Sequence, residues 1–365
     1  MPQRVTKIDS SLAPARREGS EVSGRRTSSA PNSRPALLLP RPASEACVSG
    51  SQLASEIFQP MSRSPDRGAV SQVTRRGALS AAACAGMGVW VSGRTTNPAA
   101  AAGVTTAPPL RIVDTNISLF RWPFRRLPLD STSELCLALR SLGVAVAIAG
   151  SFEGLFHRDL TGVNRRLSEE CRGRAELLPV GSVNPAKPGW QADFAVCRGE
   201  LGMRGIRLHP GVHGYALDHP DFRNLLEQAL ASGLFVQLVA AVEDRRTQPD
   251  SFRTADVDLQ PLSAACRGLD GLRLQVLNAR PSIGLAQKLC ELPGLYFDTA
   301  RLEGTDGVPR LVQSLPPGRV VFGSHTPFLI PEAALIRVHE SGRLAEEQLR
   351  SVYESGLEVV CGNVH

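Results

Sequence analysis

The C-terminal ends of several short apolar runs carry polar side chains that can take part in acid-base chemistry. One such run, Val320 to Phe322, is followed by Gly-Ser-His and then by Thr-Pro, so that His325 ends it. A run of this kind is typical of a buried strand that brings one polar side chain to its end. Asp298 ends the preceding run, and a carboxylate that holds an imidazole makes a general base. The two residues form a candidate catalytic pair, although the same pair can serve as a structural contact.

A cation and a second histidine lie at the end of another apolar run. In the segment Gly205 to Pro210, side chains alternate between two faces, which places Arg207 and His209 on the same face. An inward guanidinium needs an anion, and its planar fork matches a carboxylate. We therefore expect Arg207 to bind either a substrate carboxylate or Asp114. His209 is a candidate acid or base, and the alternative is a hydrogen bond that orients the following loop.

Further polar side chains at the ends of runs are candidates for substrate binding. Asp114, Asn116 and Ser118 share one face of the first apolar run, at a spacing of two residues. We expect them to face the site, with Asp114 as a second candidate for an orienting carboxylate; the alternative is a hydrogen-bonded cover over the strands. Gln237 and Asn278 end two later runs, and the Ala-Arg-Pro after Asn278 also allows a backbone-capping role.

These side chains need a scaffold, and from residue 110 onward apolar runs alternate with amphipathic segments. The expected strands are 111–117, 144–149, 177–183, 205–208, 234–240, 272–277, 295–298 and 319–323. The expected helices are 131–141, 160–171, 191–201, 220–232, 259–268, 282–292, 309–314, 332–338 and 345–355. Eight such units in about 260 residues predict a (β/α)8 TIM barrel of the α/β class, with functional residues at the C-terminal ends of the strands. The alternative is an open doubly wound sheet, although no G-x-G-x-x-G follows the first strand and no Walker A motif is present.

The first hundred residues differ in composition from this region. Residues 1–73 are rich in Ser, Arg, Pro and Ala without a helical or strand period, which predicts a disordered leader. Residues 74–102 hold an arginine pair at 75–76, an apolar run at 80–91 and small residues at 99–102. This pattern is typical of a twin-arginine export signal, and a chance arginine pair is the alternative.

The signal predicts a partner and a location. The partner is the twin-arginine export machinery, and the location is periplasmic or otherwise extracytoplasmic in a bacterial-type cell. The apolar run 80–91 is too short for stable membrane insertion. Met61 would place the signal at the usual distance from the start of a chain, so we expect Met61 to be the true first residue.

The positive charge of the chain resides in the leader. The whole chain has 41 Lys and Arg against 35 Asp and Glu, and residues 1–100 contribute 13 and 6 of these. The remaining 28 basic and 29 acidic residues nearly balance, so no nucleic-acid partner is expected. The six cysteines after residue 100 show no metal-binding spacing, and we expect them in the core. The sequence does not specify an oligomeric state.

Three motifs resemble those of the amidohydrolase-related metal-dependent hydrolases. They are Ile112-Val113-Asp114, the segment Gly205 to Pro210, and Phe322-Gly323-Ser324-His325-Thr326-Pro327. Gly362-Asn363 also resembles that family's closing Gly-Asn-Ala. The resemblance covers residues 103–365 and implies a TIM barrel with its active site at the strand ends. In that family the last motif reads Phe-Gly-Ser-Asp-x-Pro, so His325 stands where the family has a metal-binding aspartate.

The resemblance also implies a divalent metal, zinc above all, that activates water for hydrolysis or supports decarboxylation. The family's other ligands are His-x-His on the first strand and one histidine each on the fifth and sixth strands. The matching positions here are Asn116, Ser118, Gln237 and Asn278. Amides and a hydroxyl are poor zinc ligands compared with imidazole or carboxylate, so we expect no conventional zinc site.

Two functions remain open. The first is an exported hydrolase or lyase acting on a small carboxylate-bearing molecule, with three catalytic and binding roles. The acid or base is His325 or His209, the orienting carboxylate is Asp298 or Asp114, and the anion clamp is Arg207. A makeshift metal site at His209, His325 and Asp298 is compatible with this enzyme; without metal, the chemistry leans toward isomerisation or elimination. The second function is a non-catalytic barrel that binds a small ligand.

Overall fold

The computed structural model describes residues 110–362. The expected leader (1–73), the twin-arginine segment (74–102) and Met61 lie outside the described residues. So do residues 103–109 at the expected start of the barrel and Asn363 of the closing motif.

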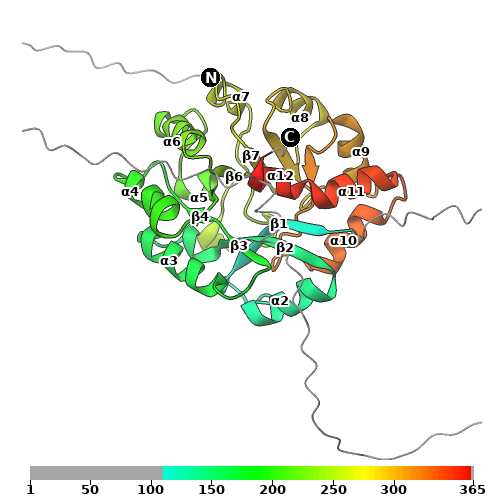
Figure 1. Ribbon diagram of the computed structural model, residues 1–365, viewed down its shortest axis with the longest axis horizontal. Helices are drawn as coiled ribbons and strands as arrows, with labels where there is room; N and C mark the ends of the chain where they lie inside the picture. The colour runs from blue at the N-terminus through cyan, green and yellow to red at the C-terminus, as the bar shows by residue number, and fades with distance from the viewer. Residues whose placement is uncertain (1–109, 363–365) are drawn as a thin grey trace, which may run out of the picture. The chain divides into compact units, whose positions relative to one another are not determined.

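Parallel strands alternate with helices along the described residues, and Figure 1 shows the helices around the outside of the strands. The strands are β1 (Ile112–Leu119), β2 (Val144–Ser151), β3 (Leu177–Pro179), β4 (Gly181–Ser182), β5 (Gly205–Leu208), β6 (Phe235–Val239), β7 (Leu274–Leu277), β8 (Leu295–Asp298) and β9 (Val320–Val321). All eight expected strands are present, and the α/β class is confirmed. The third expected strand is divided at Val180, directly after Pro179, which has no N–H to donate.

The helices follow their strands as the sequence predicted, with different ends. They are α2 (Thr132–Ser141), α3 (Leu160–Cys171), α4 (Trp190–Ala195), α5 (Pro210–His213), α6 (Pro220–Ala231), α7 (Leu262–Ala265), α8 (Ile283–Leu289), α9 (Gly307–Ser314), α10 (Pro331–His339), α11 (Glu346–Glu354) and α12 (Gly356–Cys361). Short helical turns occur at η1 (Phe152–Leu155), η2 (Val196–Glu200) and η3 (Asp250–Phe252). Side chains that accept a backbone N–H fix several starts, as Ser131 does before α2 and Asp159 before α3. The expected helix 259–268 is much shorter, and α5 and α12 were not predicted.

The strands form two sheets in strictly sequential order. One sheet is β1-β2-β3, the other is β4-β5-β6-β7-β8-β9, and every pairing is parallel. A doubly wound sheet reverses its strand order at a switch point, and neither sheet does so. Backbone hydrogen bonds also connect β1 with the segment around β9. Thr115 N donates to Phe322 O over 2.9 Å, and His325 N donates to Asn116 O over 2.8 Å.

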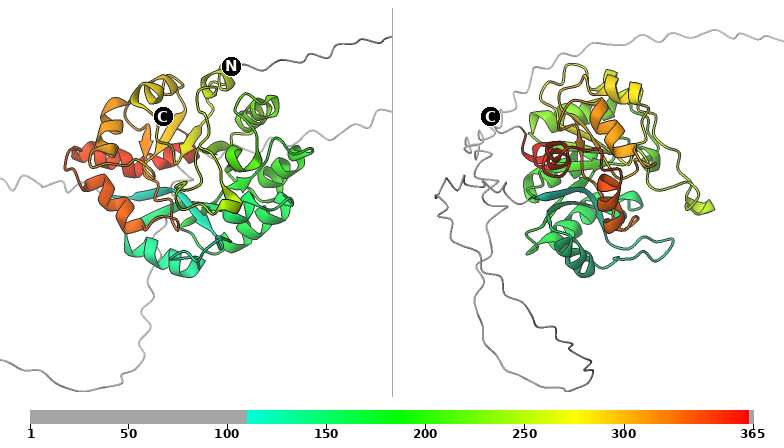
Figure 2. Two further views of the ribbon diagram at one scale, coloured as in Figure 1. Left: turned by 180° about the vertical axis from the view of Figure 1, so that it is seen from behind. Right: turned by 90° about the vertical axis from the view of Figure 1, so that its right-hand side faces the viewer.

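The core is divided by the alternation of side chains along the strands. Side chains on one face, such as Ile206, Leu208 and Val236, belong to a large apolar cluster with the surrounding helices. On the other face, Val359 and Val360 of α12 pack in a second cluster with strand residues that include Phe235. Figures 1 and 2 show α12 lying across one end of the strands. Polar side chains occupy the other end, as the sequence predicted for the C-terminal ends of the strands.

The described residues contain six cysteines, and all six are free thiols, five of them buried. This agrees with their expected place in the core. No helix between residues 110 and 362 is long and apolar enough to cross a membrane.

Candidate functional site

Six of the nine expected site residues line one small cavity of about 20 Å³ at the C-terminal ends of the strands. They are Asn116, Ser118, Arg207, His209, Asn278 and His325. Phe152, Leu155, Val239, Val242 and Phe328 complete the lining with apolar surface. The other three expected residues, Asp114, Gln237 and Asp298, are buried and hydrogen-bonded to residues of this cavity. The polar residues therefore converge although they come from strands far apart in the sequence.

Arg207, on β5, is a buried cation with neutral partners. Its Nε donates to Oε1 of Gln237 over 2.9 Å, and its Nη atoms donate to the carbonyls of Ile117 (2.8 Å) and Ile148 (3.3 Å). No carboxylate oxygen of residues 110–362 lies within 4.0 Å of the guanidinium of Arg207, which is the limit for an ion pair. The alternative prediction, a salt bridge between Arg207 and Asp114, is therefore wrong. Burial lowers the pKa of Arg207 to about 10, so the side chain stays charged at neutral pH.

A glycine makes room for this guanidinium. A Cβ atom built on Gly150, near the end of β2, would lie 2.5 Å from Nη1 and 2.8 Å from Cζ of Arg207. Both distances are shorter than any van der Waals contact with a Cβ atom. The position of Arg207 in the cavity therefore depends on the missing side chain of Gly150.

A row of amides continues from Arg207 across the strands. Gln237 on β6 donates through Nε2 to Oε1 of Gln275 on β7 over 2.9 Å. Gln275 in turn donates to Oγ1 of Thr115 on β1 over 2.7 Å. All of these side chains are buried, and each forms a hydrogen bond with the next, so that their polar groups have partners. Sequence reasoning missed Gln275 and Thr115; the signal for Gln275 was a lone amide inside the apolar run Leu274–Leu277.

Asp298, at the end of β8, holds two asparagines. Its Oδ2 accepts from Nδ2 of Asn116 over 2.7 Å, and its Oδ1 accepts from the backbone N of Asn278 over 2.9 Å. Nδ2 of Asn116 also donates to Oδ1 of Asn278 over 2.8 Å. Asn278 has a left-handed φ of 59°, which asparagine tolerates better than most residues. Burial raises the pKa of Asp298 to about 7, although the hydrogen bond from Asn116 opposes the shift.

His325 does not pair with Asp298, so that prediction is wrong. The chain turns at His325 with a left-handed φ of 60°, and Nε2 of the ring lies 2.8 Å from the carbonyl of Val242. A carbonyl only accepts hydrogen bonds, so Nε2 carries the proton and Nδ1 has the lone pair. Both oxygens of Asp298 are already occupied by Asn116 and Asn278. Burial lowers the pKa of His325 to about 3, which keeps the imidazole neutral.

His209 also lines the cavity, and no carboxylate of residues 110–362 pairs with it. It is 4% exposed, its Nδ1 has no hydrogen-bond partner among the described residues, and its ring contacts that of His213 with centroids 5.7 Å apart. The expected loop-orienting hydrogen bond is therefore not made by Nδ1. Burial and the neighbouring His213 lower the pKa of His209 well below its usual value. His209 is a neutral ring at the cavity.

Asp114 connects two backbone segments and orients no histidine, contrary to the prediction. Its Oδ1 accepts from the backbone N of Asn116 (3.0 Å) and of Ser324 (2.9 Å), so it joins β1 to the turn after β9. Oδ2 is buried and has no partner among the described residues. Burial raises the pKa of Asp114 to about 6.

The makeshift metal site of His209, His325 and Asp298 is not assembled. Between residues 110 and 362 no group of three or more His, Cys, Asp or Glu side chains is placed to hold a metal ion. The reason is local, because Asp298 is directed to two asparagines and His325 to a backbone carbonyl.

Aromatic side chains cover the cavity. Trp122, in the loop after β1, is buried and contacts Phe152 and Phe328, with ring centroids 5.3 Å and 4.8 Å away. Phe152 and Phe328 line the cavity themselves. Arg125 of the same loop pairs with Glu243 over 2.7 Å and lies over the ring of Phe328. A cavity with apolar walls and a few convergent polar groups is typical of a small-molecule site.

Comparison with known proteins relates the chain to others by structure alone. No family model matches the chain, and no curated protein sequence matches it. The 2,6-dihydroxybenzoate decarboxylase from Rhizobium matches with a TM-score of 0.54 and 11% identity, covering 69% of this chain and 98% of that chain. The 5-carboxyvanillate decarboxylase from Sphingomonas paucimobilis matches with a TM-score of 0.51 and 15% identity, covering 69% and 99%.

A protein from Staphylococcus aureus assigned as an amidohydrolase matches with a TM-score of 0.52 and 11% identity, covering 69% of this chain and 99% of that chain. Each match spans nearly the whole neighbour, so the likeness concerns the complete fold. The family resemblance read from the three sequence motifs is thereby confirmed at the level of the fold. The described residues have the fold of the amidohydrolase-related proteins.

Proposed function

We propose that the chain is an amidohydrolase-related enzyme of hydrolase or lyase type that acts on a small carboxylate-bearing molecule. The observation that carries this proposal is Arg207, a buried guanidinium that lines the cavity and has no carboxylate partner in residues 110–362. A buried cation bound only to neutral groups retains a strong preference for an anion, and a carboxylate matches its geometry. The names of two structural neighbours, both decarboxylases, are in keeping with such a substrate.

The residues around Arg207 supply polar groups for a bound carboxylate. His325 offers the lone pair of Nδ1, and its low pKa makes this atom a weak base that is always available as a hydrogen-bond acceptor. Asp298 acts as a positioning residue, because it holds Asn116 and Asn278 at the cavity. His209 presents a second neutral ring.

The side chains at the family's metal positions do not fit a divalent metal. The amide oxygens of Gln237 and Asn278 already accept hydrogen bonds from Arg207 and Asn116, so each has one lone pair engaged. The guanidinium of Arg207 lines the same cavity and repels a cation. We therefore propose chemistry by the protein's own groups at this position and derive no step through a metal.

Two further features complete the proposal. We propose that the two sheets close into a (β/α)8 barrel, and the backbone hydrogen bonds between β1 and the segment around β9 support this. We also propose export by the twin-arginine machinery, on the pattern of residues 74–102. Fusion of residues 61–102 to a reporter that is active only outside the cytoplasm tests export; a Lys-Lys pair in place of Arg75-Arg76 should abolish the signal.

Binding of small carboxylates tests the role of Arg207. We expect titration calorimetry to detect binding by the wild type and a loss of at least about tenfold in affinity for Arg207→Met. Arg273→Met is the matched control, because Arg273 also donates to backbone carbonyls (Val359 and Gly233) but lies at the opposite end of the strands. A carboxylate affinity that is equal in Arg207→Met and in the wild type would reject the proposal.

The alternative is a non-catalytic barrel that binds a small ligand, and one observation favours it. Among the carboxylates of residues 110–362, none pairs with His325 or His209 to raise its basicity, as a histidine base usually requires. A screen of small acids for turnover separates the two functions. Turnover that is lost in His325→Gln and retained in His339→Gln, a variant at the exposed end of α10, supports the enzyme. Binding without turnover supports the alternative.

A further inference from the structure

A second cavity, of about 160 Å³, adjoins the first, and we call the two the outer and the inner cavity. The two cavities share His325 and Phe328 in their linings. The outer cavity differs from the inner one in chemistry, because charged side chains make up more than half of its lining. Three are arginines (Arg125, Arg301 and Arg337) and three are acids (Glu243, Asp244 and Glu303).

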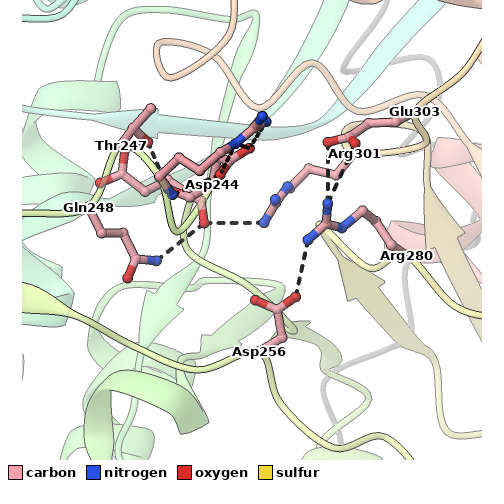
Figure 3. A network of polar contacts seen from close by, with 9 residues as sticks. Asp244, Thr247, Gln248, Asp256, Arg280, Arg301 and Glu303 are labelled. Atoms are coloured by element: carbon pink, nitrogen blue, oxygen red, sulfur yellow. Dashed lines mark hydrogen bonds and ion pairs between the residues drawn. The ribbon is translucent and has the colours of Figure 1, made fainter.

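Each of the three acids already has an arginine partner. Glu243 pairs with Arg125 over 2.7 Å, and Asp244 pairs with Arg246 over 2.6 Å. Glu303 pairs with Arg280 over 3.5 Å, as Figure 3 shows. Arg280 also pairs with Asp256 over 3.5 Å, so it is shared between two acids, whereas Glu243 and Asp244 each pair with a different arginine.

Arg301 and Arg337 have no such partner. Within residues 110–362 no carboxylate lies within 4.0 Å of either guanidinium. Arg301 donates to the backbone carbonyl of Glu243 over 3.2 Å, and Arg337 donates to the carbonyl of Ala300. The three arginines and three acids of the lining balance in number, but within residues 110–362 two of these arginines are in excess of those engaged in ion pairs.

Burial makes this excess more consequential at Arg301. The side chain is 5% exposed, so water solvates it poorly. Burial lowers its pKa, and the nearby charge of Arg280 acts in the same direction. A bound anion would compensate for this poor solvation, because it would form charge-assisted hydrogen bonds with the guanidinium groups of Arg301 and Arg337.

We propose that Arg301 and Arg337 form a second anion subsite, so that the ligand of this site is a small dicarboxylate. One carboxylate binds Arg207 in the inner cavity, the second binds Arg301 and Arg337 in the outer cavity, and the body of the molecule lies along His325 and Phe328. The first half of this arrangement rests on the proposed function of Arg207. The second half rests on Arg301 and Arg337 alone, because both line the outer cavity and neither pairs with a carboxylate in residues 110–362.

The test compares dicarboxylates with monocarboxylates of the same length. Linear α,ω-dicarboxylates of four to eight carbons, and benzene-1,3-dicarboxylate, are titrated against the matching monocarboxylates by calorimetry. We expect at least one dicarboxylate to bind about tenfold or more tightly than its partner. Arg301→Gln and Arg337→Gln should each remove this advantage and leave the monocarboxylate affinity unchanged, and Arg301→Lys should restore part of it. Arg337 is only half-buried, so its variant gives a result even where Arg301→Gln unfolds.

The outcomes separate this inference from the proposed function. Equal affinities for mono- and dicarboxylates in the wild type, with both lost in Arg207→Met, overturn the second subsite and leave the proposed function in place. No carboxylate binding by the wild type overturns both. A dicarboxylate advantage that survives in Arg301→Gln and Arg337→Gln also overturns the second subsite, because the second carboxylate must then bind elsewhere.

Discussion

The guanidinium of Arg207 donates to the side-chain oxygen of Gln237 over 2.9 Å, where an internal ion pair would require a carboxylate. The two residues face each other directly on the paired strands β5 and β6. An amide satisfies the hydrogen bond of Nε but carries no charge to neutralise Arg207, and the carboxylates of Asp298 and Asp114 act on the guanidinium only through space. This pairing is what keeps the cation available to a ligand.

Gln237→Glu should place a carboxylate of the protein itself next to Arg207, where a ligand carboxylate would otherwise bind. The new carboxylate would neutralise Arg207, and we expect the affinity for small carboxylates to fall by about tenfold or more, which is about 1.4 kcal/mol. Gln228→Glu on the exposed side of α6 is the control for the added negative charge. Titration calorimetry measures both, and unchanged affinity in Gln237→Glu would contradict the role given to Arg207.

Gly150→Ala should displace Arg207 without changing any charge. The added Cβ would lie 2.5 Å from Nη1, so the guanidinium must shift. We expect weaker carboxylate binding together with a loss of about 1–3 kcal/mol in the free energy of unfolding, as for other overpacked cores. Urea unfolding and ligand titration measure the two effects.

Gly284→Ala serves as the control for this substitution. Gly284 lies in α8, and a Cβ built there meets nothing within 4 Å. Alanine stabilises a helix relative to glycine by about 0.5–1 kcal/mol, so this variant should gain stability and bind carboxylates normally. Equal ligand affinity in the two glycine variants would show that Gly150 does not position Arg207.

Asp298 should make stability fall as the pH rises toward neutrality. Burial raises its pKa to about 7 in the folded chain, whereas an unfolded chain leaves an aspartate near about 3.9. The folded state therefore holds the proton more tightly. The contribution of Asp298 to the free energy of unfolding is complete below about pH 4 and is lost as the pH rises through about 7.

Denaturant unfolding of the wild type and Asp298→Asn between pH 4 and pH 8 measures this contribution. The stability of the wild type relative to the variant should decrease across that range. Other titrating groups are present in both proteins, so the difference reports Asp298 together with its electrostatic coupling to Asp114. A difference that stays constant with pH would mean that the pKa of Asp298 is not raised by folding.

Metal analysis of the purified protein should find no stoichiometric zinc, manganese or iron. The reason is the donor set, in which the amides of Asn278 and Gln237 already bond to neighbouring side chains and Arg207 lines the cavity. Dialysis against a chelator should leave the thermal unfolding midpoint unchanged. One equivalent of tightly bound metal, or a lower midpoint after chelation, would contradict the proposed metal-poor site.

The sequence predicted the scaffold and the face on which the site lies. Apolar runs that end in Arg207, Asn278 and His325 were sufficient, because the alternation of side chains and the parallel order of strands bring such ends together. The same reasoning placed Asn116 and Ser118 correctly at the cavity, since their spacing of two residues assigns them to one side of β1.

The sequence did not predict which polar groups bond to each other. Asp298 and His325 follow adjacent strands, yet a left-handed turn at His325 directs its ring to Val242. Such turns depend on backbone contacts between distant segments, which no local pattern records. Arg301 escaped notice for a similar reason, because only the pairing of the surrounding acids with other arginines makes its charge unusual.

The hydrogen-bonded amides of Gln237 and Gln275 determine when the binding cavity forms during folding. Arg207 is connected through Gln237 and Gln275 to Thr115, and Thr115 donates through Oγ1 to the carbonyl of Phe322, near the end of the domain. The guanidinium is thus held by the first and the last strand together. A chain that has folded only its earlier strands would lack this support. Ligand binding can therefore report, during refolding, the moment at which the final strand docks.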